Sequence, residues 1–452
     1  MKAIVTRRSF DALRLTLALV LLTYVWRIQD LVPGIAPLKL PTIATGAAIV
    51  LLLFDSTAQR HFGAACRHRV GQLIIWFALA AMVSAAASID FGWSLDYLVK
   101  ALLPALALAI VVPAGVFVAG DATMFAALQV AGAVFYCGAI LTRFKVGADG
   151  RLGALIFYDG NDIGMLLVCT LPLCAYFARH ASRALLRVLS VVAAVLFVFT
   201  IAKTGSRGAF LGLIAVGAYV VLRFRTVRVS TRLAVVGVSA CLLLAGATTK
   251  YWNQMDTILH PTEDYNWAGK DDFGRMSIWA RGVGYAEDRP LTGVGAGAFN
   301  FAEGTISPLA RRQEYGQGLK WSSPHNSFVQ VLAEFGFPGF ALFLAILFYG
   351  YRAATRLARA SLHRGPKARR RGELSQAHAA ALAGYVVSGF FLSQAYAPYL
   401  YFVIGMIIGL DLTVRAEWQA DDAELNAQLY TTQIEEAGLA APEPAHGSLV
   451  WS

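Results

Sequence analysis

The chain has 452 residues, of which 57% are hydrophobic and 15% are charged. This apolar fraction exceeds what the core of a soluble domain absorbs, so a soluble globular fold is excluded. The formal net charge of +11 does not indicate nucleic-acid binding, because the basic residues form short clusters between apolar blocks, as in membrane proteins. We expect a protein that contacts membrane lipids and no nucleic acid.

Apolar blocks of about 15 to 25 residues follow one another along the chain, and each can cross about 30 Å of hydrocarbon as a helix. They predict an all-α polytopic integral membrane protein with about twelve transmembrane helices. The predicted spans are roughly 12–26, 37–54, 72–88, 97–118, 122–142, 161–178, 186–202, 207–222, 232–248, 325–350, 376–394 and 398–414.

Four clusters of basic residues fall on one side of these spans, around residues 60–69, 179–187, 223–232 and 352–371. Lys and Arg are enriched in cytoplasmic loops, so this side is the cytoplasm and both termini lie there. The chain then divides into spans one to nine (1–248), a periplasmic loop domain (249–324), spans ten to twelve (325–414) and an acidic cytoplasmic tail (415–452).

The loop 249–324 is too long and too rich in tryptophan to be a simple connection. Its aromatic residues could bind sugar rings, anchor the membrane interface or pack, and spacing alone does not decide among these roles. Apolar residues at helical spacing predict a helix lying flat on the membrane, with Arg275 on another face. These residues are Phe273, Met276, Trp279 and Val283.

Several cations fall on the predicted outer side, where a charge near the bilayer is costly unless it pairs, reaches water or meets an anion. They are Arg143, Lys145, Arg151, Lys203, Arg207, Arg275 and Arg281. Each is a candidate for binding an anionic ligand. The alternative is pairing with a neighbouring carboxylate, namely Asp149, Asp159, Asp162, Glu263, Asp271 or Asp272.

Arg207 follows Ser206, which the pattern predicts to be a helix N-cap, so Arg207 is the first helical residue. The N-terminal end of a helix is already partly positive, and a cation there is explained when both are directed at one anion such as phosphate. The sequence thus indicates an anion site at Arg207 and leaves the identity of the anion open.

His325 lies in the segment Ser323-Pro324-His325-Asn326. Ser323 is predicted to be the N-cap and Pro324 the first helical residue, which places His325 in the first turn of the tenth span at the outer surface. The helix N-terminus and nearby arginines favour a neutral imidazole, the form that accepts a proton. The alternative is a capping or core histidine without a catalytic part.

No nucleophile elbow, Walker A loop or zinc-protease helix is present. Gly293 to Gly297 is interpreted as a turn, because it lacks nucleotide-fold spacing. The acidic segment Asp159-Gly160-Asn161-Asp162 is interpreted as a helix N-cap in preference to a metal loop. We expect neither a metal nor another cofactor.

Three groups of motifs, taken together and in this order, resemble the O-antigen ligase and polymerase superfamily, most strongly from about residue 200 to 340. The first is Ser206-Arg207-Gly208-Ala209. The second is Gly274-Arg275-x-x-Ile278-Trp279 with Pro290-Leu291-x-Gly293-x-Gly295. The third is Pro324-His325-Asn326-Ser327-Phe328-x-Gln330 with Glu334-x-Gly336-x-x-Gly339.

The resemblance implies a GT-C-like membrane glycosyltransferase of the bacterial inner membrane whose active site faces the periplasm. It implies undecaprenyl-diphosphate-linked O-antigen as the donor and a lipid A-core oligosaccharide as the acceptor, with inversion at the anomeric carbon. His325 would be the general base. The implied diphosphate-binding residues are Arg207, Arg275, Arg151 and Lys203, and the supporting residues are Asn326 and Ser206.

Other functions fit parts of the pattern. An O-antigen polymerase would use the same donor with a second lipid-linked saccharide as acceptor. A protein-glycosylating relative often carries a larger C-terminal module than the short acidic tail found here. A lipid-linked saccharide flippase, from a different class, would place charges near mid-membrane or in repeated halves, and the chain shows neither pattern.

Overall fold

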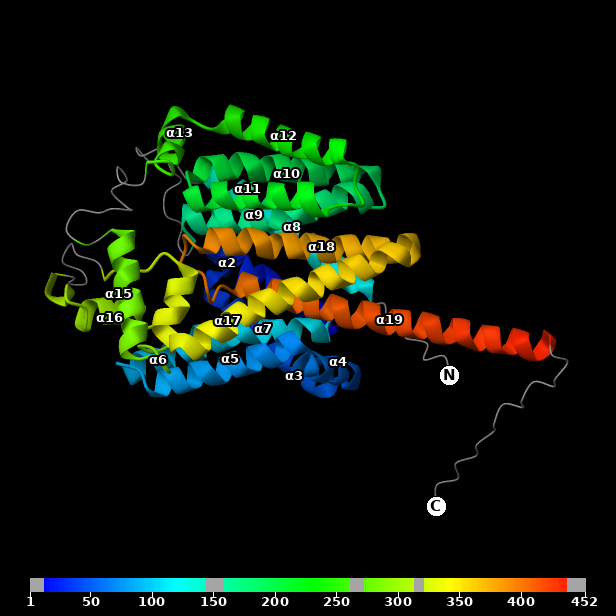
Figure 1. The fold of residues 1–452 in the computed structure, drawn as a ribbon, viewed down its shortest axis with the longest axis horizontal. Coiled ribbons are helices and arrows are strands. Elements are labelled where there is room, and N and C mark those ends of the chain that lie inside the picture. The colour runs from blue at the N-terminus through cyan, green and yellow to red at the C-terminus, as the bar shows by residue number, and fades with distance from the viewer. Residues whose placement is uncertain (1–11, 144–157, 261–271, 273, 313–320, 437–452) are drawn as a thin grey trace, which may run out of the picture.

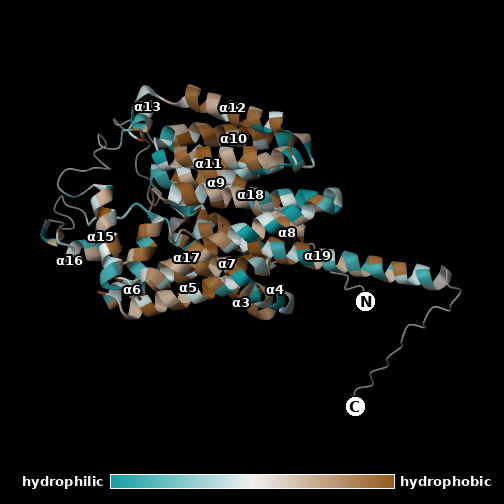
Figure 2. Ribbon diagram, in the orientation of Figure 1, coloured by the Kyte–Doolittle hydropathy of each residue, from teal (hydrophilic) through white to brown (hydrophobic). Residues whose placement is uncertain are grey.

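The computed structural model describes residues 12–143, 158–260, 272, 274–312 and 321–436. Within these ranges the chain forms helices and turns and contains no strand. The long helices form one bundle (Figure 1), in which apolar residues dominate, whereas the projecting end of the last helix is mostly hydrophilic (Figure 2). The predicted all-α polytopic class is confirmed.

The N-terminal half of the bundle runs from α1 to α8. Asp55 ends α3 in an extended conformation, and its side chain accepts the N–H groups of Thr57 and Ala58, so α4 starts at 102° to α3. The elements are α1 (Ala12–Val20), η1 (Leu21–Val25), α2 (Ile28–Leu31), η2 (Pro33–Leu38), α3 (Leu40–Phe54), α4 (Ser56–Arg67), α5 (Arg69–Ala86), α6 (Phe91–Tyr97), η3 (Leu98–Leu102), α7 (Leu103–Ala114) and α8 (Ala119–Arg143).

The C-terminal half is built of hairpins that are joined by short turns, with one larger insertion between α12 and α17. That insertion contains α13, α15, α16 and η5. The elements are α9 (Gly160–His180), α10 (Ala184–Thr204), α11 (Arg207–Arg223), α12 (Val229–Gly246), α13 (Thr249–Asp256), α15 (Arg275–Asp288), α16 (Phe299–Thr305), η5 (Ala310–Arg312), α17 (Ser327–Ala360), η6 (Ser361–His363), α18 (Gly365–Gly389) and α19 (Pro398–Glu436).

The hairpins give the bundle two distinct ends. The starts of α9, α11 and α17 share one end with α13, α15 and α16, which we call the site end (Figure 1). The connections α9–α10, α11–α12 and α17–α18 lie at the opposite end, together with α4, and we call it the arginine end. All four basic clusters are in these segments, so the structure gathers them at one end of the bundle.

Each of the twelve predicted spans falls on a helix. Eight described helices are long and apolar enough to cross a membrane, or nine if α3 and α4 together form one broken span. The number twelve therefore stays a prediction. The helices not counted are shorter or more polar: α11 has 17 residues, and α18 begins with a basic turn.

The helix α17 is not a straight rod, since it breaks at Gly336. The backbone of Gly336 has a φ of 64° and a ψ of −168°, which glycine adopts far more readily than other residues. The N–H of Phe337 donates to the carbonyl of Pro290 at 2.9 Å. The predicted span 325–350 is thus divided into a short first half, Ser327 to Phe335, and a long second half.

The helix α19 continues without interruption from the bundle to Glu436. The sequence predicts a cytoplasmic tail from residue 415 that begins as a short helix, and in the structure this helix continues the last span and projects from the arginine end (Figure 1). Ion pairs hold its first projecting turns to the start of α18. Arg364 binds Asp422 at 2.9 Å, and Arg371 binds Glu417.

Candidate functional site

The start of α11 places Arg207 at the site end. Ser206 caps the helix, since its Oγ accepts the N–H of Ala209 at 3.2 Å, and this confirms the predicted cap. The guanidinium of Arg207 donates to Thr257 Oγ1 at 2.8 Å, which joins it to the segment after α13. The helix itself is fixed by close packing, because a Cβ on Gly212 would lie 2.1 Å from Ser388 Oγ of α18.

Arg275 begins α15, which runs across the ends of the bundle helices (Figure 1). The helix buries Ile278 and Tyr285, whereas Met276 and Val283 are 48% and 37% exposed. The predicted helix is present, and two residues of its predicted apolar stripe, Met276 and Val283, are exposed. Phe273, the first residue of the predicted apolar stripe, lies outside the described residues.

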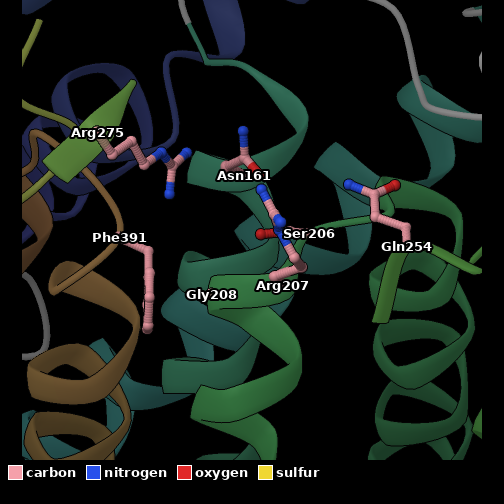
Figure 3. A pocket seen from close by; sticks show the side chains of 7 residues that line it. All are labelled: Asn161, Ser206, Arg207, Gly208, Gln254, Arg275 and Phe391. Atoms are coloured by element: carbon pink, nitrogen blue, oxygen red, sulfur yellow. The ribbon is translucent and has the colours of Figure 1, made fainter. Parts of the chain in front are cut away.

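Arg207 and Arg275 line one pocket, although they come from helices that are far apart in the sequence. In Figure 3 both guanidiniums extend toward the space beside Asn161, Arg207 from α11 and Arg275 from α15. The pocket encloses about 360 Å³, including its open mouth. Its other lining residues are all uncharged: Asn161, Ser206, Gly208, Gln254 and Phe391.

This pocket has the chemistry of an anion site. Two guanidiniums can each grip phosphate oxygens with a pair of N–H groups. The N-terminus of α11 adds the partial positive charge of the helix dipole at the same place. The pocket therefore holds three sources of positive potential and is well suited to a diphosphate.

His325 lies just before α17. The cap of α17 is Asn326, whose Oδ1 accepts the N–H groups of Phe328 and Val329. The prediction that Ser323 is the cap is wrong, because the Ser323 hydroxyl bonds with the side chain of Asn300 at 3.0 Å. His325 thus precedes the helix and adopts a left-handed backbone with a φ of 43°.

A left-handed backbone is unusual for histidine and costs about 1–3 kcal/mol, so neighbouring contacts must hold it. One such contact comes from α15, because Trp279 Nε1 donates to the carbonyl of Pro324 at 2.7 Å. The Trp279 ring also packs edge-on against Phe390, with ring centroids 5.2 Å apart. The helix that carries Arg275 therefore also positions the backbone of His325.

The pKa of His325 is lowered from its usual value. Although solvent reaches the side chain, the surrounding protein desolvates the ring, and this is the largest cause. The positive charge of Arg275 lowers the pKa further, while the negative charge of Asp159 opposes both effects. A neutral imidazole at pH 7 agrees with the sequence-based expectation. His325 does not itself line the two-arginine pocket.

The start of α9 brings a carboxylate close to this centre. The Asp159 side chain caps α9 by accepting the N–H groups of Asn161 and Asp162, and the Asp162 side chain in turn accepts the N–H of Asp159. This reciprocal cap confirms the interpretation of the acidic segment. Asp162 also accepts Gln394 Nε2 at 2.7 Å, which ties α9 to the loop that contributes Phe391.

Two further outer cations that the structure describes, Arg143 and Lys203, do not line the pocket. Arg143 donates to the carbonyl of Leu31, and the Lys203 ammonium lies 5.1 Å from the centroid of the Phe199 ring. Lys145 and Arg151 lie outside the described residues. In the part of the chain that the structure covers, no cluster of three or more His, Cys, Asp or Glu side chains could hold a metal ion.

Arg281 pairs with a carboxylate that sequence spacing did not indicate. Its guanidinium binds Glu303 of α16 at 2.6 Å, and the Tyr285 hydroxyl donates to the same carboxylate at 2.6 Å. Glu303 is fully buried. The pairing interpretation therefore holds for Arg281, but with a partner 22 residues away, and the pair fixes α15 against α16.

Glu334 is a second buried carboxylate that sequence reasoning did not single out as a site residue. It accepts the N–H groups of Gly297 and Phe299 and the hydroxyl of Tyr396. Gly293, Gly295 and Gly297 have φ values of 65°, 120° and 67°, so this run is a turn, as interpreted from the sequence. Glu334 anchors that turn to α17.

The family model for O-antigen ligases matches residues 192–344. This range contains Arg207, Arg275 and His325, whereas Asn161 and Phe391 of the pocket lie outside it. Among curated proteins, no match is found.

Proposed function

Because the chain belongs to the O-antigen ligase family through residues 192–344, we propose that it is itself an O-antigen ligase. It transfers the glycan from undecaprenyl diphosphate to a lipid A-core sugar at the periplasmic face of the inner membrane. Family membership and the apolar helices make it a multi-pass membrane protein that acts on a lipid-linked glycan and a lipid acceptor. The identity of donor and acceptor is the proposed part.

The observation that carries the proposal is the convergence of Arg207 and Arg275 on one pocket beside the N-terminus of α11. A diphosphate gains negative charge when it leaves the sugar, and preorganised cations stabilise the charge that develops in the transition state. The pocket supports this role because its other described lining residues are uncharged.

In the proposed step, neutral His325 takes the proton of an acceptor hydroxyl. The hydroxyl oxygen forms a bond to the anomeric carbon, while the bond from that carbon to the diphosphate oxygen breaks. The electron pair of the broken bond stays on the diphosphate, where Arg207 and Arg275 bind it. Attack opposite the leaving group inverts the configuration of the anomeric carbon.

Supporting roles follow from the contacts. Ser206 fixes the helix start that presents Arg207, and Asn326 fixes the start of α17 beside His325. That Arg151 and Lys203 extend the diphosphate site stays a prediction.

The test is transfer in a purified system that contains undecaprenyl-diphosphate O-antigen and lipid A-core, without nucleotide and with EDTA. We compare the wild type with His325→Ala and with His363→Ala as a matched control. His363 is an exposed histidine in η6, at the arginine end. We expect complete lipopolysaccharide from the wild type and the control, and none from His325→Ala.

Other outcomes would replace the proposal. Lengthening of the lipid-linked glycan with lipid A-core untouched would indicate a polymerase. Movement of the donor across the bilayer without transfer would indicate a flippase. Equal transfer by His325→Ala and the wild type would remove His325 as the general base.

A further inference from the structure

A second pocket lies at the arginine end, between the turn that follows α11 and the hairpin of α17 and α18. Its lining includes Arg223, Arg225 and Arg359. It encloses about 700 Å³, including its open mouth. The mechanism above makes no use of this pocket, which lies at the opposite end of the bundle from Arg207.

Some arginines at the same end are neutralised by carboxylates. Arg179 binds Glu373 at 3.4 Å, and Arg364 and Arg371 bind carboxylates of α19. By contrast, none of the three pocket arginines forms an ion pair with a carboxylate in the described ranges. Three positive charges therefore share one pocket without a direct ion pair among the described residues.

The helix dipole does not account for this arrangement. Arg223 and Arg359 stand in the last turns of α11 and α17, where a single cation is stabilised by the negative end of the dipole. That effect places one charge at each helix end. It does not explain why two helix ends and Arg225 of the connecting turn converge on one pocket, since like charges repel.

The remaining lining residues are uncharged. Thr226, Thr355 and Gln376 supply the polar lining of the pocket, and the Thr355 hydroxyl donates to the Tyr351 carbonyl at 2.9 Å. The amide of Gln376 donates to the carbonyl of Arg223 at 3.1 Å, which fixes the end of α11 against α18. Ala358 and Leu362 form the apolar part of the wall.

Exposed apolar residues lie in the chain directly beside the pocket. Leu222, which precedes Arg223, is 67% exposed, and Val229 and Leu233 in the first turns of α12 are 55% and 53% exposed. Val229 and Leu233 are four residues apart and share one face of α12. A charged pocket bordered by an apolar surface matches a molecule with a phosphate headgroup and acyl chains.

We propose that this pocket binds the headgroup phosphate of an anionic phospholipid in the leaflet that borders the arginine end. The acyl chains lie along the exposed residues of α11 and α12. Clusters of Arg and Lys between membrane helices are the known type of site for such headgroups. In the orientation proposed above, this leaflet is the cytoplasmic one.

The test measures lipid binding to the full-length protein by native mass spectrometry, after delipidation in detergent, with phosphatidylglycerol or phosphatidylcholine as the probe. The double variant Arg223→Gln/Arg359→Gln removes two pocket charges. The matched control Arg352→Gln/Arg356→Gln removes two exposed arginines of α17 that do not line the pocket. We expect phosphatidylglycerol affinity to fall about thirtyfold in the first variant only.

The proposal is overturned if both double variants lose the same affinity, if neither does, or if phosphatidylcholine binds as tightly as phosphatidylglycerol. Millimolar inorganic phosphate is the second probe, and full displacement of the lipid by it would show a free-phosphate site. If the double variant does not fold, Arg359→Gln alone should weaken binding about fivefold. Because glycan transfer is not measured, the result is independent of the proposed enzymatic function.

Discussion

Trp279 Nε1 donates a 2.7 Å hydrogen bond to the carbonyl of Pro324, the residue directly before His325. The bond joins α15 to the segment that holds His325 at a φ of 43°. Because Arg275 and Trp279 are one helical turn apart, a single helix presents the proposed diphosphate-binding cation and supports the proposed base.

Trp279→Phe removes this hydrogen bond and keeps an aromatic ring that can contact Phe390. We expect kcat to fall about tenfold to a hundredfold, with little change in the KM for the donor, since a small displacement of a catalytic group is costly. Trp93→Phe is the control, because its indole donates to Gly297 at a different place in the loop. An equal loss of kcat in both variants would show a general effect of losing an indole.

Arg207→Lys should reduce kcat by about a hundredfold to a thousandfold, because lysine supplies a point charge in place of a planar group that binds two phosphate oxygens. Steady-state transfer kinetics check this expectation. Arg289→Lys is the control, since Arg289 is exposed and donates to the Ala87 carbonyl. If Arg207→Lys retains wild-type kcat, the arginine does not bind the leaving diphosphate.

The pH dependence of transfer should report the charges around His325. Only the neutral imidazole accepts a proton, so kcat rises with pH through the pKa of His325 and is constant above it. Arg275 lowers this pKa and Asp159 raises it. Arg275→Gln should therefore move the acidic limb of the profile to higher pH, and Asp159→Asn should move it to lower pH.

The two substitutions are expected to shift the pH profile in opposite directions. A general loss of activity would not produce such opposite shifts. Asparagine is as good an N-cap as aspartate, so Asp159→Asn preserves the start of α9. Movement of both profiles in the same direction would contradict the assignment of His325 as the titrating base.

Arg281→Gln should destabilise the loop strongly, because it leaves the fully buried Glu303 without its cation. Breaking a buried pair in this way costs about 3–5 kcal/mol. Thermal unfolding in detergent measures the loss. Glu287→Gln changes an exposed carboxylate on the same helix and should shift the unfolding temperature little. Similar melting of both variants would show that the pair carries no stability.

Local signals in the sequence predicted local structure well. The caps at Ser206 and Asp159 follow from residues within three positions of each helix start, and the structure confirms both. The apolar blocks predicted the membrane helices because each block is by itself long enough to cross the hydrocarbon layer as a helix. At the start of α17 two cap residues compete, and Asn326 acts as the cap because the Ser323 hydroxyl binds Asn300.

Contacts between distant segments could not be predicted from spacing. Glu303 lies 22 residues after Arg281 in the chain, and the two side chains pair because α15 packs against α16. Gln254 and Phe391 line the two-arginine pocket. A glutamine or a phenylalanine in a membrane protein does not by itself indicate a binding site in the sequence. The fold alone brings them to Arg207.

The break in α17 determines what can move at the site end. Because the helix is interrupted at Gly336, the carbonyls of Ala333 and Glu334 accept the N–H groups of Val294 and Gly295. The turn from Gly293 to Gly297 thereby supplies the backbone donors that these two carbonyls of α17 lack within the helix. Swinging this turn outward would break both bonds and leave the Ala333 carbonyl without the N–H of Val294, so we expect the turn and the first half of α17 to move together as one rigid body.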